Sequence, residues 1–118
     1  MPLEQLKEKL ESDPAKVQFN DVMAVIDSIY QYTPTEFSNG LNQDKVVNPA
    51  GTNEGSCRLF AFAKEQNLSE SQTLHCFGDF YRKDVLENPN GSDHANIRHF
   101  MKYGWEGIHF MGSALQKR

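Results

Sequence analysis

Apolar side chains recur at helical spacing through the first third of the chain. Leu3, Leu6 and Leu10 predict a short amphipathic helix that ends at Asp13-Pro14. A longer apolar stripe predicts a second helix, which Pro34 stops. The stripe of this second helix comprises Val22, Val25, Ile26, Ile29 and Tyr30.

Residues 33–52 interrupt this helical pattern. They are rich in Thr, Asn, Gly and Pro, with one short apolar pair at Val46-Val47. We expect a long ordered loop here, with room for a small extended pairing. Loops of this length in compact domains are usually functional or internally packed.

Three further helices are predicted after this loop. The helix at about 53–66 is apolar nearly all round, which is typical of a central helix. The helix at 70–87 begins with a capping box made by Ser69 and Gln72. The last helix runs over about 93–103, with Gly104 as the residue that follows its C-terminus.

The pattern as a whole predicts one compact all-α domain over residues 1–118, with about five helices around a core built on 53–66 and 70–87. Trp105, Ile108 and Phe110 are expected to pack an extended tail back onto this body. Residues 111–118 are expected to be frayed. The composition, with 38% hydrophobic and 24% charged residues, is that of a soluble globular protein.

One short segment occurs twice. Residues 48–53 read NPAGTN and residues 88–93 read NPNGSD, and each opens an apolar helical segment. Pro fixes φ and Gly tolerates positive φ, while the residues after the Gly can cap exposed helix N–H groups; these are Thr52, Asn53, Ser92 and Asp93. If the two helix entrances converge in space, they form a polar site for an anion or a partner carboxylate. Otherwise they are two capped turns, which is the more ordinary interpretation.

Net charge and hydropathy limit the classes of partner. The formal net charge is −4, and residues 1–36 carry seven acidic and three basic side chains. The net charge disfavours nonspecific nucleic-acid binding, which needs a basic surface. We interpret the acidic N-terminal part as a solvated face rather than a docking surface. No apolar run reaches the length of a membrane span, and MPLEQLKEKL lacks the apolar region of a Sec signal peptide. We therefore expect a cytoplasmic protein whose partner is a protein or a small molecule, not a nucleic acid or a membrane.

Cys57 is the first candidate for chemistry, because it lies near the start of the helix at 53–66. A helix dipole can lower the pKa of a thiol there and favour the thiolate. With a His base such as His94, Cys57 could serve a small hydrolase or acyltransferase. The alternative is that Cys57 is simply the first core residue of an apolar helix.

Metal and cofactor sites are not predicted. His94 and His99 are five residues apart and point to different faces of a helix, and no HExxH or paired CxxC spacing occurs. We therefore predict no metal ligands and no cofactor.

Polar and aromatic residues near helix ends suggest a binding surface instead. Arg82 could clamp a carboxylate or phosphate, or its stem could simply cover apolar neighbours. Tyr103 and Trp105 could anchor an interface or cap the core. The proposed binding residues are Asn53, Glu54, Asp93, His94, Arg82, Tyr103 and Trp105.

Four stretches carry a resemblance to a known family. They are FSNG (37–40), NPAGTNEGSCRLFAFAK (48–64), QTLHCFGDFYRKDVLENPNG (72–91) and DHANIRHFMKYGWEGIHF (93–110). Together they resemble the HopJ type III effector family over residues 33–110, whereas residues 1–32 match only in helical, acidic character.

The resemblance implies relationship to proteins that plant-pathogenic bacteria deliver into host cells by type III secretion. It assigns no catalytic residues. Three functions therefore remain open: a non-enzymatic binding or regulatory module, a thiol-dependent enzyme using Cys57, and a secreted effector acting on a host protein.

Overall fold

Two small antiparallel sheets accompany the helices in the computed structural model, which describes residues 1–118. The prediction of an all-α domain is therefore wrong, and the fold is mixed α/β. The α-helices are α1 (Leu3–Ser12), α2 (Phe19–Ile29), α3 (Glu54–Glu65), α4 (Glu70–Cys76) and α5 (Ala95–Tyr103). The shorter helical segments are η1 (Pro14–Lys16), η2 (Asn42–Asp44), the π-helix η3 (Phe80–Val85) and η4 (Gly104–Gly107).

The strands are two or three residues long, and both sheets join distant parts of the chain. β1 pairs with β5, and β2 lies between β3 and β4. Within the second sheet, Phe37 lies opposite Asn48 on one side and Phe110 on the other. The strands are β1 (Tyr30–Tyr32), β2 (Phe37–Asn39), β3 (Val46–Asn48), β4 (His109–Phe110) and β5 (Leu115–Lys117).

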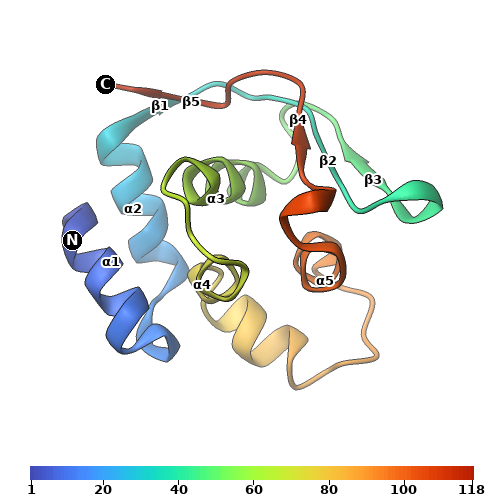
Figure 1. Ribbon diagram of the computed structural model, residues 1–118, viewed down its shortest axis with the longest axis horizontal. Helices are drawn as coiled ribbons and strands as arrows, with labels where there is room; N and C mark the ends of the chain where they lie inside the picture. Colours follow the sequence, from blue (N-terminus) through green and yellow to red (C-terminus); the bar gives the residue numbers. More distant parts are fainter.

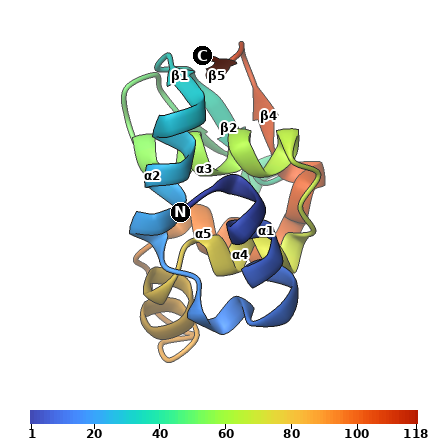
Figure 2. The same cartoon turned by 90° about the vertical axis from the view of Figure 1, so that its left-hand side faces the viewer.

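Helix α3 lies in the middle of the molecule. The strands run along one side of it, α4 lies on the opposite side, and α1 with α2 flanks it across from α5 (Figures 1 and 2). This position follows from the sequence pattern, because Leu59, Phe60 and Phe62 bury side chains on more than one face of α3. The prediction of a central helix is confirmed.

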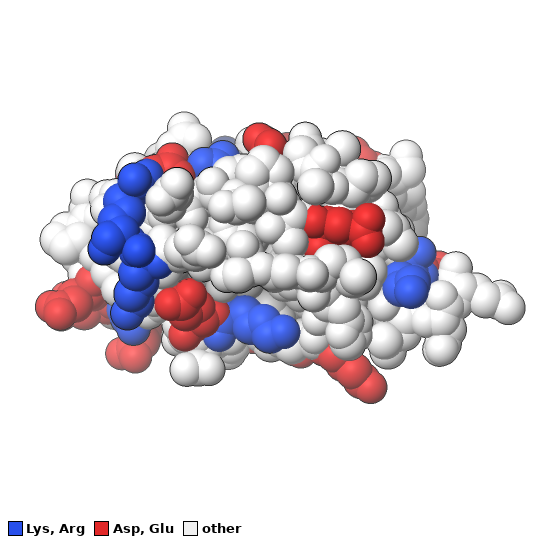
Figure 3. Space-filling view, turned by 90° about the horizontal axis from the view of Figure 1, so that it is seen from above, with Lys and Arg blue, Asp and Glu red and all other residues white.

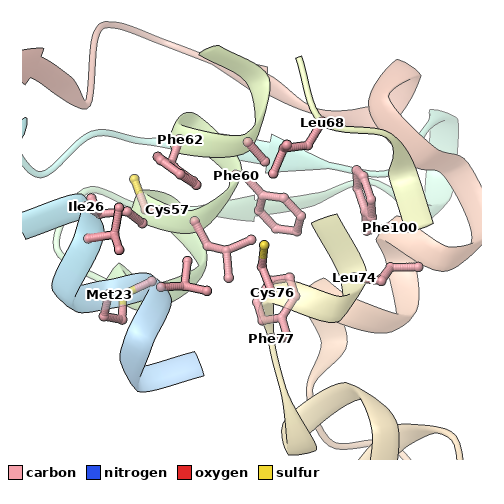
Figure 4. Close-up of a cluster of buried hydrophobic side chains, with 14 of the residues drawn as sticks. Met23, Ile26, Cys57, Phe60, Phe62, Leu68, Leu74, Cys76, Phe77 and Phe100 are labelled. Atoms are coloured by element: carbon pink, nitrogen blue, oxygen red, sulfur yellow. The ribbon is translucent and has the colours of Figure 1, made fainter. Parts of the chain in front are cut away.

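The core is one continuous cluster around α3. Figure 4 shows Phe60 from α3 between Phe100, Leu74 and Phe77, with the two thiols of Cys57 and Cys76 inside the same apolar cluster. Both cysteines are free and buried. The burial of this cluster is the main source of stability.

The loop at 33–52 contains the small extended pairing that the sequence allowed. Strands β2 and β3 are its two halves, with Ser38 opposite Val47 and Asn39 opposite Val46. The η2 turn at 42–44 connects them. The prediction of an ordered loop with a short pairing is confirmed, although the third strand of this sheet comes from the C-terminal region.

The C-terminal tail differs from its prediction. Residues 111–118 were expected to be frayed, but Leu115–Lys117 form β5 against β1, with Tyr32 opposite Leu115. Ala114 and Leu115 are buried. The physical reason is burial of these two side chains together with backbone pairing to a strand more than eighty residues earlier.

The helix predicted over 70–87 is interrupted at Gly78. Gly78 has φ +64°, and a Cβ there would lie 2.8 Å from the backbone nitrogen of Phe19. The close approach of the start of α2 therefore requires glycine at this position. After the break the chain continues as η3 in a new direction (Figure 1).

Charged side chains are dispersed on the face that carries the strands. Figure 3 shows Lys and Arg toward both ends of this face, acidic side chains beside and between them, and uncharged areas that separate these groups. No continuous basic surface covers this side of the molecule. The structure contains no helix of the length and apolarity needed to span a membrane.

Candidate functional site

Each of the two Asn-Pro segments leads into a helix through a residue in the left-handed conformation. Asn53, with φ 48° and ψ 47°, precedes α3, and His94, with φ 52° and ψ 51°, precedes α5. The first of these residues is the last of its segment, while the second follows its segment directly. The two entrances are therefore similar in backbone geometry but offset by one residue.

Neither entrance has a side-chain cap, contrary to expectation. The Thr52 hydroxyl donates instead to the carbonyl of Pro49 at 2.7 Å. The carboxylate of Asp93 accepts a 2.6 Å hydrogen bond from Arg98, which holds the pKa of Asp93 below its usual value. Arg98 also donates to the Asn88 carbonyl at 2.9 Å and so fixes the second segment internally. The capping side chains are thus used to shape the turns.

The two entrances converge on one cavity of about 370 Å³, which we call the entrance cavity. The first hydrogen bond of α3 is donated by Cys57 and that of α5 by Ile97. The amides before them have no intrahelical acceptor, and four of the residues that carry such amides, Gly55, Ser56, Ala95 and Asn96, line the cavity. The lining residues are Phe19, Val46, Asn48, Asn53, Gly55, Ser56, Phe77, Phe80, His94, Ala95, Asn96 and Ile97.

Buried asparagines connect the β3-β2-β4 sheet to α5, and two of them, Asn48 and Asn96, also line this cavity. The Asn96 side chain donates to Asn48 Oδ1 at 2.9 Å and accepts from the amides of Asn39 and Asn48, each at 3.1 Å. Asn53 Nδ2 donates to Asn48 Oδ1 at 2.8 Å and links the first entrance to this network. These hydrogen bonds between buried amides hold both helix starts in a fixed relation, while Asn39 Oδ1 is left without a partner. The burial of these asparagines could not be predicted from the sequence, since their type and spacing resemble those of ordinary turn residues.

His94 stands at the cavity with a carboxylate partner. Its Nε2 lies 3.0 Å from Asp84 Oδ2 and 3.9 Å from a carboxylate oxygen of Asp93. The ring of Phe80 packs against the imidazole with centroids 5.3 Å apart. Both Phe80 and Asp84 come from η3, so this π-helix orients the His94 ring. The sequence did not predict the role of Asp84, although this residue lies in the stretch QTLHCFGDFYRKDVLENPNG (72–91) quoted above.

Three phenylalanines supply the apolar wall. Phe19 meets Phe80 edge to face at 5.2 Å and stacks toward Phe77 at 6.4 Å. Phe19 also packs against the start of α3. A Cβ added at Gly55 would lie 3.0 Å from the Phe19 ring, which shows how closely the two approach. These rings come from α2, the end of α4 and η3, so the break at Gly78 helps to create the wall.

Cys57 lies outside the cavity wall. Its side chain is buried, and its sulfur donates to the Thr35 carbonyl at 3.4 Å. Burial raises the pKa of the Cys57 thiol, which keeps it protonated at neutral pH. The nearest polar partner of His94 is Asp84, so the structure does not pair this thiol with the candidate base.

Arg82 is engaged by the protein backbone. Its guanidinium donates to the carbonyls of Pro14 at 3.2 Å and His75 at 3.1 Å, and also to the Val17 carbonyl. Burial, followed by the nearby guanidinium, lowers the pKa of His75, which favours a neutral ring 3.3 Å from Arg82. Arg82 therefore extends from η3 to the backbone of the connection between α1 and α2, and it does not line the entrance cavity.

Tyr103 and Trp105 also lie apart from the entrance cavity. The Tyr103 hydroxyl donates to Asp44 at 2.5 Å, and Trp105 Nε1 donates to the Leu68 carbonyl at 3.1 Å. The indole also meets the rings of Phe60 and Phe100 and covers the core. Of the seven proposed binding residues, the structure brings Asn53 and His94 to one cavity wall. Glu54 and Asp93 are exposed beside it.

The structure shows no group of three or more His, Cys, Asp or Glu side chains that could hold a metal ion.

Comparisons with other proteins identify the family. No curated protein matches the sequence. The crystal structure of VPA0580, a protein of unknown function, is similar over 100% of this chain and 95% of its own, with 47% identity and a TM-score of 0.94. The family model described as HopJ type III effector protein matches residues 3–115, including the N-terminal helices that showed only general resemblance. The chain therefore belongs to the HopJ type III effector protein family.

Proposed function

We propose that this HopJ-family protein is a non-enzymatic binding module and that its ligand site is the entrance cavity. The observation that carries the proposal is convergence: two helix entrances forty positions apart in sequence line one cavity together with His94 and three phenylalanines. Concave sites with apolar walls and a few polar groups are typical of ligand binding.

The arrangement favours binding over thiol catalysis. The thiol of Cys57 is buried against the Thr35 carbonyl, and its pKa is raised, whereas a nucleophilic thiol needs a lowered pKa and access to substrate. Asp84 orients the His94 ring. A ring held in this way suits a group that donates a hydrogen bond to a ligand or accepts one from it.

An Ala95→Trp substitution tests the site. Ala95 is exposed and lines the cavity, so an indole there should fill the cavity while leaving the core intact. We expect fragments that bind the native chain in ligand-observed NMR, drawn from carboxylates, amides and heteroaromatic rings, to lose at least tenfold in affinity, a change of about 1.4 kcal/mol.

Ala24→Trp is the matched control, because Ala24 is an exposed helical alanine that does not line the cavity. Binding that survives Ala95→Trp unchanged, or a native chain that binds none of the fragments, would contradict the proposal.

A second candidate function, delivery into a host cell, is supported by the family to which the chain belongs. We expect the full chain fused to a translocation reporter to enter host cells from a donor with a type III system, and not from a donor lacking its secretion ATPase. Deletion of residues 1–32 is a poor test, because it removes Leu6, Leu10 and Val22 from the core. Fusion of residues 1–32 alone to the reporter is the better second test, because its result does not depend on the folding of a truncated core. Equal signals from both donors would refute delivery by this route.

A further inference from the structure

The charges of the entrance cavity restrict what it can bind. No Lys, Arg, Asp or Glu is among its lining residues, and His94 is its one ionisable side chain. The Nε2 atom of His94 already faces Asp84 at 3.0 Å. Sites for phosphates and other strong anions usually present Arg or Lys. The two helix N-termini attract the negative end of a ligand dipole. Because no cationic side chain supports them and Asp84 lies beside His94, a ligand without a large net charge suits this cavity best.

The apolar wall is aromatic and reaches the surface. Phe80 is 42% exposed although it packs on Phe19 and His94, so part of its ring is left without a protein partner. Aromatic rings attract other aromatic rings in stacked or edge-to-face geometry. The volume of about 370 Å³ is at the small end of the range for ligand pockets. The wall thus suits one small planar ring system.

The polar wall offers both acceptors and donors. Asn53 Nδ2 donates a hydrogen bond to Asn48 Oδ1, whereas Asn53 Oδ1 accepts none within the chain and is a free acceptor. The Ser56 hydroxyl and His94 Nδ1 make no hydrogen bond within the chain, and neither is a buried unsatisfied atom, so both are open to a ligand. A ligand edge that carries donors and acceptors side by side would satisfy all three.

We propose that the entrance cavity binds a small, uncharged, planar heteroaromatic ring with hydrogen-bond donors and acceptors along one edge, of the nucleobase or pyridine-carboxamide kind. The ring lies against Phe80 and Phe19, and its polar edge faces Asn53, Ser56 and His94. This inference rests on the proposed binding function. The free small molecule is the ligand, because neither the cavity wall nor the net charge of −4 favours a polyanionic nucleic acid.

Calorimetric titration of the full chain tests the ligand class. The probes are adenine, nicotinamide, adenosine 5′-monophosphate, benzoate, toluene and a single-stranded oligonucleotide. We expect adenine or nicotinamide to bind at least tenfold more tightly than benzoate or toluene. The nucleotide should bind more weakly than the base, because no cationic side chain meets its phosphate.

Two variants locate the ring and its edge. Phe80→Ala should weaken binding of the heteroaromatic probe about tenfold. Stacking of a base on one aromatic side chain typically contributes about this much to affinity. Ser56→Ala should reduce the preference for nicotinamide over toluene. Met101→Ala is the control, because Met101 is 45% exposed and does not line this cavity. Circular dichroism of each variant verifies that it is folded.

The outcomes separate this inference from the proposed function. If benzoate or toluene binds in an Ala95→Trp-sensitive manner and the heteroaromatic probes do not, the ligand class is wrong and the binding site stands. Tightest binding by the nucleotide or the oligonucleotide would likewise overturn the ligand class. If no probe binds and none of the wider set of fragments binds in an Ala95→Trp-sensitive manner, both proposals fail.

Discussion

Phe60→Ala is expected to lower the free energy of unfolding by about 3–5 kcal/mol. Phe60 is 0% exposed at the centre of α3. Its ring centroid lies 5.0 Å from that of Phe100, 5.4 Å from Phe77, 6.0 Å from Phe37 and 6.3 Å from Trp105. These partners come from separate elements before and after α3, so truncation opens a cavity that no single neighbour can fill by a local shift.

Urea unfolding followed by circular dichroism measures this loss. Phe80→Ala is the matched control, because it removes the same side chain from a position that is 42% exposed. Its effect on the midpoint should be much smaller. An unchanged midpoint for Phe60→Ala, or equal losses in both variants, would show that the core is not centred on α3.

The helices could be predicted from the sequence because each carries its own signal. Helix α3 has an apolar pattern on nearly all sides, and α4 begins with a capping box made by Ser69 and Gln72 that the structure confirms. Such signals are contained within one or two turns of chain. The interruption at Gly78 could not be predicted in this way, because its cause is the backbone of Phe19, about sixty residues earlier.

The β1-β5 sheet and the third strand of the other sheet were not predicted, for a related reason. Strands of two or three residues show no alternation that a period-2 pattern could detect. The partner of β1 is β5 at the other end of the chain, and β4 completes a sheet begun by β2. Their stability comes from pairing and from burial of residues such as Leu115, both of which depend on tertiary structure.

The candidate site shows the same division. The repeated Asn-Pro segments correctly pointed to two similar helix entrances, and the structure brings Asn53 and His94 to one cavity. Asp84 and Asn96 were missed because their roles arise only from long-range contacts. A sequence shows which polar residues are available, but the partner that each one takes is decided by the fold.

Arg82→Met is the second change for which we expect a large loss of stability, about 2–3 kcal/mol. The sequence suggested that Arg82 could clamp a ligand, whereas its guanidinium donates to the carbonyls of Pro14, Val17 and His75. Methionine keeps much of the apolar stem but none of the donors. The carbonyls of the α1–α2 connection would then lose a charged partner, and part of them would remain poorly hydrated.

Lys83→Met is the matched control for this substitution. Lys83 is the next residue in η3, and its one ionic contact is an exposed pair with Asp79 at 3.9 Å. Such pairs contribute little to stability, so the urea midpoint should hardly move.

At temperatures where Arg82→Met remains folded, it should bind cavity ligands as tightly as the native chain, because Arg82 does not line the entrance cavity. Full stability combined with lost binding would return Arg82 to the ligand site, whereas lost stability with retained binding would establish it as the residue that ties the N-terminal helices to η3.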